Sequence, residues 1–146
     1  MYGSTPERYA PEPKTEETNM ATTRQKALDI AGKMLPPDLM QLLGPDNRAP
    51  FGAELSDLGL AMIFEPLWTR EGIDLRTRSL ITVAMLITLR AHSELAIHAP
   101  AAIRNGATVA ELEEIIYQAA GYAGFPAAAS ARDVVREALK KAGMLP

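Results

Sequence analysis

Apolar side chains recur three and four residues apart along most of the chain, which is the period of an α-helix buried on one side. No stretch of useful length alternates apolar and polar residues as a half-buried strand would. Helices are predicted over residues 22–35, 51–64, 74–91, 93–104, 108–120 and 126–142, with a short helical piece over 38–43. We therefore expect an all-α fold of about six helices.

Residues that start or stop helices support these boundaries. Thr108 and Glu111 have the spacing of a capping box, in which each side chain bonds the backbone N–H of the other. Asp74 is a suitable N-cap for the helix over 74–91, which is apolar on nearly every side and is therefore predicted to be central. A further cap is expected at Ser93, and helix ends are expected at Pro66, Gly121 and Gly124.

The chain has 146 residues, a length that fits one domain. Residues 1 to about 21 contain three prolines and few large apolar side chains, so burial cannot offset the entropy of ordering them. We expect a flexible N-terminal arm over residues 1–21 and a helical domain over residues 22–146.

Composition narrows the possible functions. The formal net charge of −3 gives no positive field for nucleic acid, and the absence of cysteine excludes disulfides, thiolate metal sites and thiol nucleophiles. The longest apolar run, residues 80–89, is too short to cross a bilayer, and the N-terminus carries no apolar signal region. We expect a soluble, cytoplasmic protein without membrane or nucleic-acid partners.

Glu94 and His98 are the first candidates for chemistry. Four residues apart on one helix, they lie on the same face with their β-carbons about 6 Å apart, where a carboxylate and an imidazole can share a proton. The alternative is a surface ion pair or a histidine satisfied within the core. His92 lies at a helix junction, where it can cap, bind substrate or be solvated. Because positions 92, 94 and 98 do not share one helical face, no metal site is expected.

Arg76 and Arg78 stand near the start of the helix over 74–91, where the helix dipole disfavours positive charge. They are explained either by ion pairs, with Asp74, Glu71 or a neighbouring chain, or by Arg78 binding a substrate carboxylate through two parallel hydrogen bonds. Tyr122 lies in a small-residue turn between two helices, which can also be a tight packing corner. No phosphate loop or dinucleotide fingerprint is present.

Four segments together resemble the carboxymuconolactone decarboxylase family, in its cysteine-free γ-carboxymuconolactone decarboxylase branch. They are Trp68-Thr-Arg-Glu-Gly-Ile-Asp-Leu-Arg-Thr-Arg-Ser-Leu-Ile-Thr, Glu94-Leu-Ala-Ile-His98, Asn105-Gly-Ala-Thr-Val-Ala-Glu-Leu-Glu-Glu and Tyr122-Ala-Gly-Phe-Pro-Ala, in register over about residues 51–140. The related alkylhydroperoxidases carry a Cys-x-x-Cys pair where this chain has Ala91 and Glu94, so disulfide-cycling peroxidase activity is excluded. Pro100, His92 and the Phe64-Glu-Pro-Leu stretch depart from the family pattern.

The resemblance implies an all-α subunit assembled as a homo-oligomer, a trimer or a hexamer. It also implies cofactor-independent decarboxylation of a γ-carboxylated butenolide to an enol-lactone, in the breakdown of aromatic compounds. His98 and Glu94 would then supply or relay the proton, and Arg78 would hold the lactone oxygen or the spectator carboxylate. Trp68, His92 and Tyr122 are the candidate substrate-binding residues. The alternatives are lactone hydrolysis or isomerisation, or a ring-forming binding protein without turnover.

Overall fold

The computed structural model describes residues 16–43, 51–52 and 54–146. Within these residues the chain forms seven α-helices and one π-helical segment and no strand, which confirms the all-α prediction. The elements are α1 (Glu16–Met34), α2 (Pro37–Leu42), α3 (Glu54–Gly59), η1 (Leu60–Trp68), α4 (Leu75–Leu89), α5 (His92–Arg104), α6 (Val109–Tyr122) and α7 (Phe125–Lys141).

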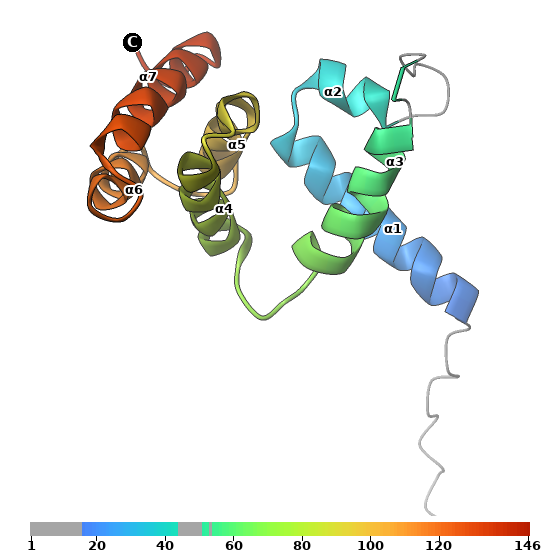
Figure 1. The fold of residues 1–146 in the computed structure, drawn as a ribbon. Helices are drawn as coiled ribbons and strands as arrows, with labels where there is room; N and C mark the ends of the chain where they lie inside the picture. The colour runs from blue at the N-terminus through green and yellow to red at the C-terminus, as the bar shows by residue number, and fades with distance from the viewer. Residues whose placement is uncertain (1–15, 44–50, 53) are drawn as a thin grey trace, which may run out of the picture.

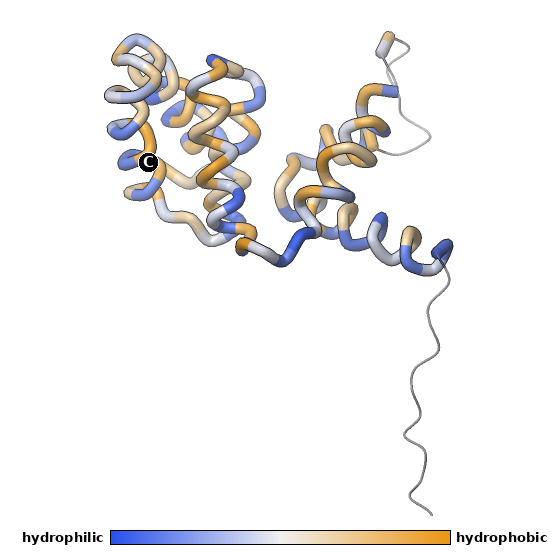
Figure 2. Tube along the Cα trace, turned by 60° about the horizontal axis from the view of Figure 1, so that its bottom comes forward, coloured by the Kyte–Doolittle hydropathy of each residue, from blue (hydrophilic) through white to orange (hydrophobic). Residues whose placement is uncertain are grey.

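The helices fall into two groups (Figure 1). Helices α4 to α7 pack on one another, whereas α1, α2, α3 and η1 form the second group, and α1 also packs against α5. The segment over residues 69–74 that joins the groups is mostly hydrophilic (Figure 2). The first group has its own core, built around Val83, Ile87, Leu95, Leu112 and Leu139.

A second, smaller core lies where the two groups meet. Met34 of α1, Trp68 of η1 and Ala101 of α5 are buried together there. Two polar contacts join the same elements: Arg104 Nη1 donates to the carbonyl oxygen of Met34 at 2.8 Å, and an ion pair links α1 to η1. These buried side chains and polar contacts fix the position of η1 against α5.

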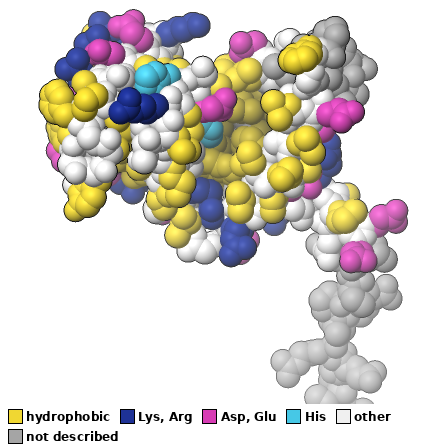
Figure 3. All heavy atoms as spheres, viewed as in Figure 1, with side chains coloured by type: hydrophobic (Ala, Val, Ile, Leu, Met, Phe, Trp, Pro, Cys, Tyr) yellow, Lys and Arg dark blue, Asp and Glu magenta, His cyan; other side chains and the backbone are white. Residues whose placement is uncertain are grey.

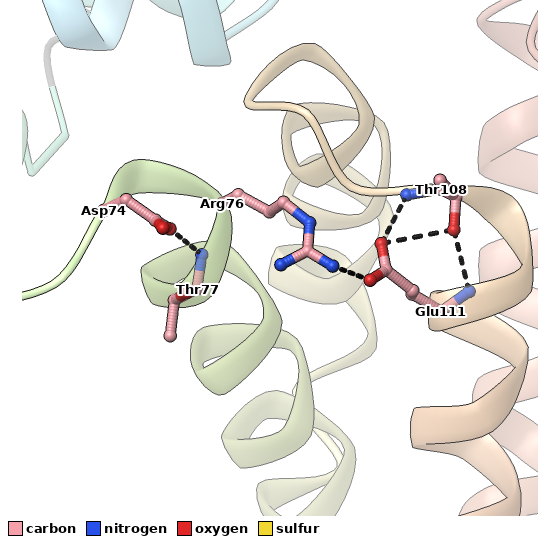
Figure 4. A network of polar contacts seen from close by, with 5 residues as sticks. All are labelled: Asp74, Arg76, Thr77, Thr108 and Glu111. Carbon is pink, nitrogen blue, oxygen red and sulfur yellow. Dashed lines mark hydrogen bonds and ion pairs between the residues drawn. The ribbon is translucent and has the colours of Figure 1, made fainter.

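The start of α4 is tied to the start of α6 by a polar network (Figure 4). Asp74 Oδ1 accepts the backbone N–H of Thr77 at 2.6 Å, a contact that lowers the pKa of Asp74. The predicted capping box is confirmed, with Thr108 Oγ1 and Glu111 Oε2 each accepting the backbone N–H of the other residue. Arg76 forms an ion pair with Glu111, so the cation at the start of α4 is paired across helices.

Two predicted boundaries differ from the structure. Helix α1 begins at Glu16 rather than at Thr22, and its acidic first turn is favourable at a helix N-terminus. Residues 16–21 are therefore helical, and the rest of the predicted arm lies outside the described residues. Pro66 does not end the helix predicted over 51–64: α3 passes into η1, which contains Pro66 and continues to Trp68. In the wider π-turn, the carbonyl against which a proline ring presses in an α-helix is displaced.

Two further helix signals were also wrong. Ser93 is not the cap of α5, because Arg90 takes a left-handed conformation (φ 54°) that reverses the chain within two residues, and the helix starts at His92. Gly121 lies inside α6, where one glycine costs only about 1 kcal/mol. Gly124, at φ 95°, ends this segment as predicted. Pro100 is buried within α5, which runs on to Arg104.

Helix α4 is less central than its composition predicts. Ser79, Val83 and Ile87 are buried, but Ile81, Met85 and Leu89 on another side are exposed, Leu89 by 73%. One side of α4 therefore presents apolar area to solvent. None of the described helices is long and apolar enough to cross a membrane.

Candidate active site

A pocket of about 270 Å³ opens where the two helix groups meet. Figure 3 shows hydrophobic side chains gathered in the hollow between the groups. The lining comes from α2 and its flanks, from α3 and η1, and from one face of α5. It consists of Leu35, Leu39, Leu43, Leu55, Ser56, Gly59, Leu60, Ile63, Phe64, Trp68, Glu94, Ile97 and His98. The pocket is thus mainly apolar, with its polar groups supplied by α3 and α5.

Three aromatic rings are stacked along one wall of this pocket. The rings of Trp68 and His98 lie 6.2 Å apart at an interplanar angle of 19°, and those of Phe64 and Trp68 lie 6.1 Å apart at 24°. Phe64 and Trp68 share a face of η1, while His98 comes from α5. Trp68 is only 4% exposed, so it holds the imidazole from the core side of the pocket.

The protonation of His98 follows from this setting. Burial lowers the pKa of His98, and the charge of Glu94, one turn earlier on α5, raises it by a smaller amount. The Nδ1 atom is buried and has no hydrogen-bond partner among the described residues. At neutral pH the imidazole is therefore uncharged, beside a carboxylate and within a largely apolar pocket.

Arg78 lies elsewhere on the interface between the groups. Its Nη2 donates to the carbonyl oxygen of Arg70 at 3.1 Å, which ties α4 to the joining segment. Its Nε is buried without a partner among the described residues. Arg78 does not line the pocket of Glu94 and His98, although Trp68 lies between that pocket and the hollow next to Arg70.

His92 and Tyr122 are not part of this pocket either. His92 is the exposed first residue of α5. Tyr122, the 87% exposed last residue of α6, lines a different hollow with Ala84 and Thr88 of α4. Among the described residues, no group of three or more His, Asp or Glu side chains is placed to hold a metal ion.

Of the candidate residues, the structure thus brings together Trp68, Glu94 and His98. Sequence reasoning missed the apolar lining, because Leu39, Leu60 and Ile97 have the spacing of ordinary helix-core positions. It also missed Ser56, a lone serine on a short helix. Only the spacing of Glu94 and His98 and the aromatic Trp68 carried a signal in the sequence.

Together, the fold and this pocket define an all-helical protein with a small-molecule site at a seam between two helix groups. The chain matches the carboxymuconolactone decarboxylase family over residues 54–137, more than half of its length, and it belongs to that family. The 4-carboxymuconolactone decarboxylase of Acinetobacter baylyi is 34% identical over 101 residues, covering 69% of this chain and 75% of the relative. The nitrosuccinic acid decarboxylase of Metarhizium robertsii is 33% identical over 93 residues, covering 64% and 65%.

Proposed function

We propose that this protein is a decarboxylase that removes CO₂ from a γ-carboxylated butenolide and leaves an enol-lactone. The observation that carries the proposal is the uncharged His98 next to Glu94 in an apolar pocket, within the residues that match the family. Both relatives are named decarboxylases, one for a carboxylated lactone and one for a nitro acid. Each substrate carries a group that can accept the electron pair of the broken C–C bond.

In the proposed reaction, the bond between the γ-carbon and the carboxylate breaks and CO₂ leaves. The electron pair passes through the conjugated ring to the carbonyl oxygen of the lactone, and a proton then adds at a ring carbon to give the enol-lactone. The lactone is the electron sink, so the protein has to stabilise the developing negative charge and deliver the proton. The proton comes from solvent and reaches the carbon through His98, whose imidazole is protonated only transiently during the reaction. The negative charge of Glu94 favours that imidazolium, and its carboxylate is placed to relay the proton to it.

The apolar lining supports this chemistry. The charge of the leaving carboxylate is localised in the substrate and spread over several atoms in the transition state. A pocket lined by side chains such as Leu60, Ile63 and Ile97 solvates the localised charge poorly. The same pocket destabilises the dispersed charge of the transition state by a smaller amount. Binding the reactive carboxylate there therefore favours loss of CO₂.

Arg78 is assigned to the developing charge on the lactone oxygen. Its guanidinium is held at one nitrogen by the Arg70 carbonyl, and its buried Nε–H has no acceptor among the described residues. A fixed donor without an acceptor is suited to an oxygen that becomes negative only during the reaction. Arg78 lies outside the lining of the pocket, so its role is tested by kcat and KM of an Arg78→Lys variant.

The proposed enzyme is a homo-oligomer, a trimer or a hexamer. Support comes from the exposed apolar side chains of α4, namely Ile81, Met85 and Leu89, which line one hollow of the surface. Tyr122 and Phe125, also largely exposed, extend the apolar surface at the junction of α6 and α7. A second copy of the chain would bury this surface.

Turnover by a His98→Gln variant tests the proposed function. The substrate is the γ-butenolide that carries a carboxylate and a carboxymethyl group on its γ-carbon, and CO₂ release is measured. We expect the variant to lose at least about tenfold in kcat, the low side of what a general acid contributes. His92→Gln is the matched control, since His92 is exposed and outside the pocket. Equal turnover by His98→Gln and the wild type would remove His98 from the reaction.

A further inference from the structure

The side chains that line the pocket around His98 also indicate which substituent the substrate can carry beside the carboxylate that reacts. Apart from Ser56, Gly59, Glu94 and His98, every described lining residue is leucine, isoleucine, phenylalanine or tryptophan. Among the described lining residues, Glu94 is the only one with a formal charge at neutral pH, and that charge is negative. Arg78, proposed above to meet the lactone oxygen, is held outside this lining by its hydrogen bond to the Arg70 carbonyl, so the described lining offers no cation to an additional anion.

Apolar side chains also reach the mouth of the pocket, where the exposed Glu94 is the charged group among the described lining residues. Leu55 and Ile63 line the pocket and yet are 73% and 47% exposed, so they lie at its solvent side. Three further lining residues, Leu35, Leu39 and Leu43, come from the α2 region, which precedes the residues that match the family. A substituent that extends from the reacting carbon toward Leu55 and Ile63, or toward the leucines of the α2 region, meets hydrocarbon.

We propose that the substrate is a monocarboxylate: a γ-carboxylated lactone whose second substituent is an alkyl or aryl group rather than a second carboxylate. This inference rests on the proposed function. The reactive carboxylate loses its localised charge during the reaction, so its poor solvation is relieved in the transition state. A spectator carboxylate keeps its charge throughout, so its burial against the apolar lining, with the negative Glu94 at the mouth, weakens binding with no gain in rate.

Two γ-carboxybutenolides of nearly the same shape test this inference. One carries a carboxymethyl group on the γ-carbon and the other carries isobutyl, which replaces the two carboxylate oxygens by methyl groups. We expect kcat/KM to be about 10- to 100-fold higher for the isobutyl lactone, from the apolar burial of the methyl groups alone. A higher kcat/KM for the carboxymethyl lactone would overturn the inference and leave the proposed decarboxylation in place.

A substitution at the mouth provides a second test with a matched control. Ile63→Lys places a cation in the lining, so we expect it to shift the preference toward the carboxymethyl lactone by about fivefold, the upper range for an exposed ion pair. Met62→Lys adds the same charge at the next residue, which is 66% exposed and outside the lining, and should leave the preference within about twofold. Equal shifts in both variants would contradict the placement of the substituent against Ile63.

Binding of the decarboxylated lactones separates this inference from the proposed function. If neither γ-carboxybutenolide loses CO₂, calorimetry with the isobutyl and carboxymethyl product lactones still measures the preference of the pocket. Tighter binding of the isobutyl product then supports the apolar substituent while the decarboxylation fails. Tighter binding of the carboxymethyl product, or no binding of either, overturns the inference.

Discussion

Replacement of Trp68 by leucine tests whether the aromatic stack controls His98. Trp68 is 4% exposed and lies between the rings of Phe64 and His98. The substitution keeps an apolar side chain at this position but removes both ring contacts and opens space next to the imidazole. We expect a loss of stability and, because water then reaches His98, a rise of the His98 pKa toward its ordinary value.

The size of the stability loss follows from burial. A buried tryptophan removes about 150–250 Å² from water, worth about 4–6 kcal/mol at about 25 cal/mol per Å². Leucine recovers about half of this, so with the lost ring contacts the net cost is about 2–4 kcal/mol, less than a truncation to alanine. For a chain of this length, that corresponds to a decrease in Tm of about 4–16 °C.

The wild-type protein offers a direct assay, because Trp68 is its only tryptophan. Imidazolium quenches indole fluorescence at contact distance, so the emission of Trp68 should decrease as His98 is protonated, with a midpoint below the ordinary histidine pKa. His98→Gln should abolish this titration and His92→Gln should not. In Trp68→Leu, the His98 pKa is measured by NMR.

Phe64→Leu is the control for loss of an aromatic ring without exposure of His98. Phe64 contacts the far side of Trp68, so this variant should lose stability but keep the low pKa of His98. An unchanged His98 pKa in Trp68→Leu, or an equal rise in Phe64→Leu, would refute the role of Trp68 as the cover of the imidazole.

Four further predictions follow from the other contacts. Arg78→Lys should lower kcat with little change in KM, because lysine keeps the charge but loses the planar guanidinium; unchanged kcat would remove Arg78 from the reaction. The pKa of His98 is lower in the folded than in the unfolded chain, so its contribution to stability is full above pH 6.5 and is lost as pH falls toward the folded pKa. The Tm of the wild type should therefore decrease more than that of His98→Gln between about pH 7.5 and 5.5. Equal decreases would argue against a buried His98. Thr108→Ala should cost about 1 kcal/mol through loss of the capping box, whereas Ser130→Ala, an exposed control, should change stability by less than about 0.5 kcal/mol in a urea titration. Met85→Lys should dissociate the oligomer in native mass spectrometry, and a monomeric wild type would contradict the proposed assembly.

The parts of the fold that sequence reasoning predicted are those set by neighbouring residues. The capping box of Thr108, the N-cap Asp74 and the helix break at Gly124 need only partners within a few positions. Glu94 and His98 share a helix face for the same reason, because helical geometry fixes residues four apart. A local pattern was therefore enough to find Glu94 and His98 but not Ser56, the other polar side chain that α3 and α5 bring to the described lining.

The predictions that were wrong concern features that depend on contacts between distant segments. The π-helix that carries Pro66 is stabilised by packing on α1, and the left-handed Arg90 by the close pairing of α4 with α5. The apolar periodicity of α4 shows that the helix is hydrophobic on most sides. It does not show which side the same chain covers, and Met85 remains exposed.

The sequence by itself determined the helical class, the caps at Asp74 and Thr108, the lack of thiol chemistry and the pairing of Glu94 with His98, because each depends on composition or on residues within one or two turns. Only the tertiary structure decided that η1 brings Trp68 onto His98 and that the α2 region closes an apolar pocket around them. It also separated Arg78, His92 and Tyr122 from the lining of that pocket. These features arise from packing between residues far apart in the chain, which apolar spacing along one helix does not specify.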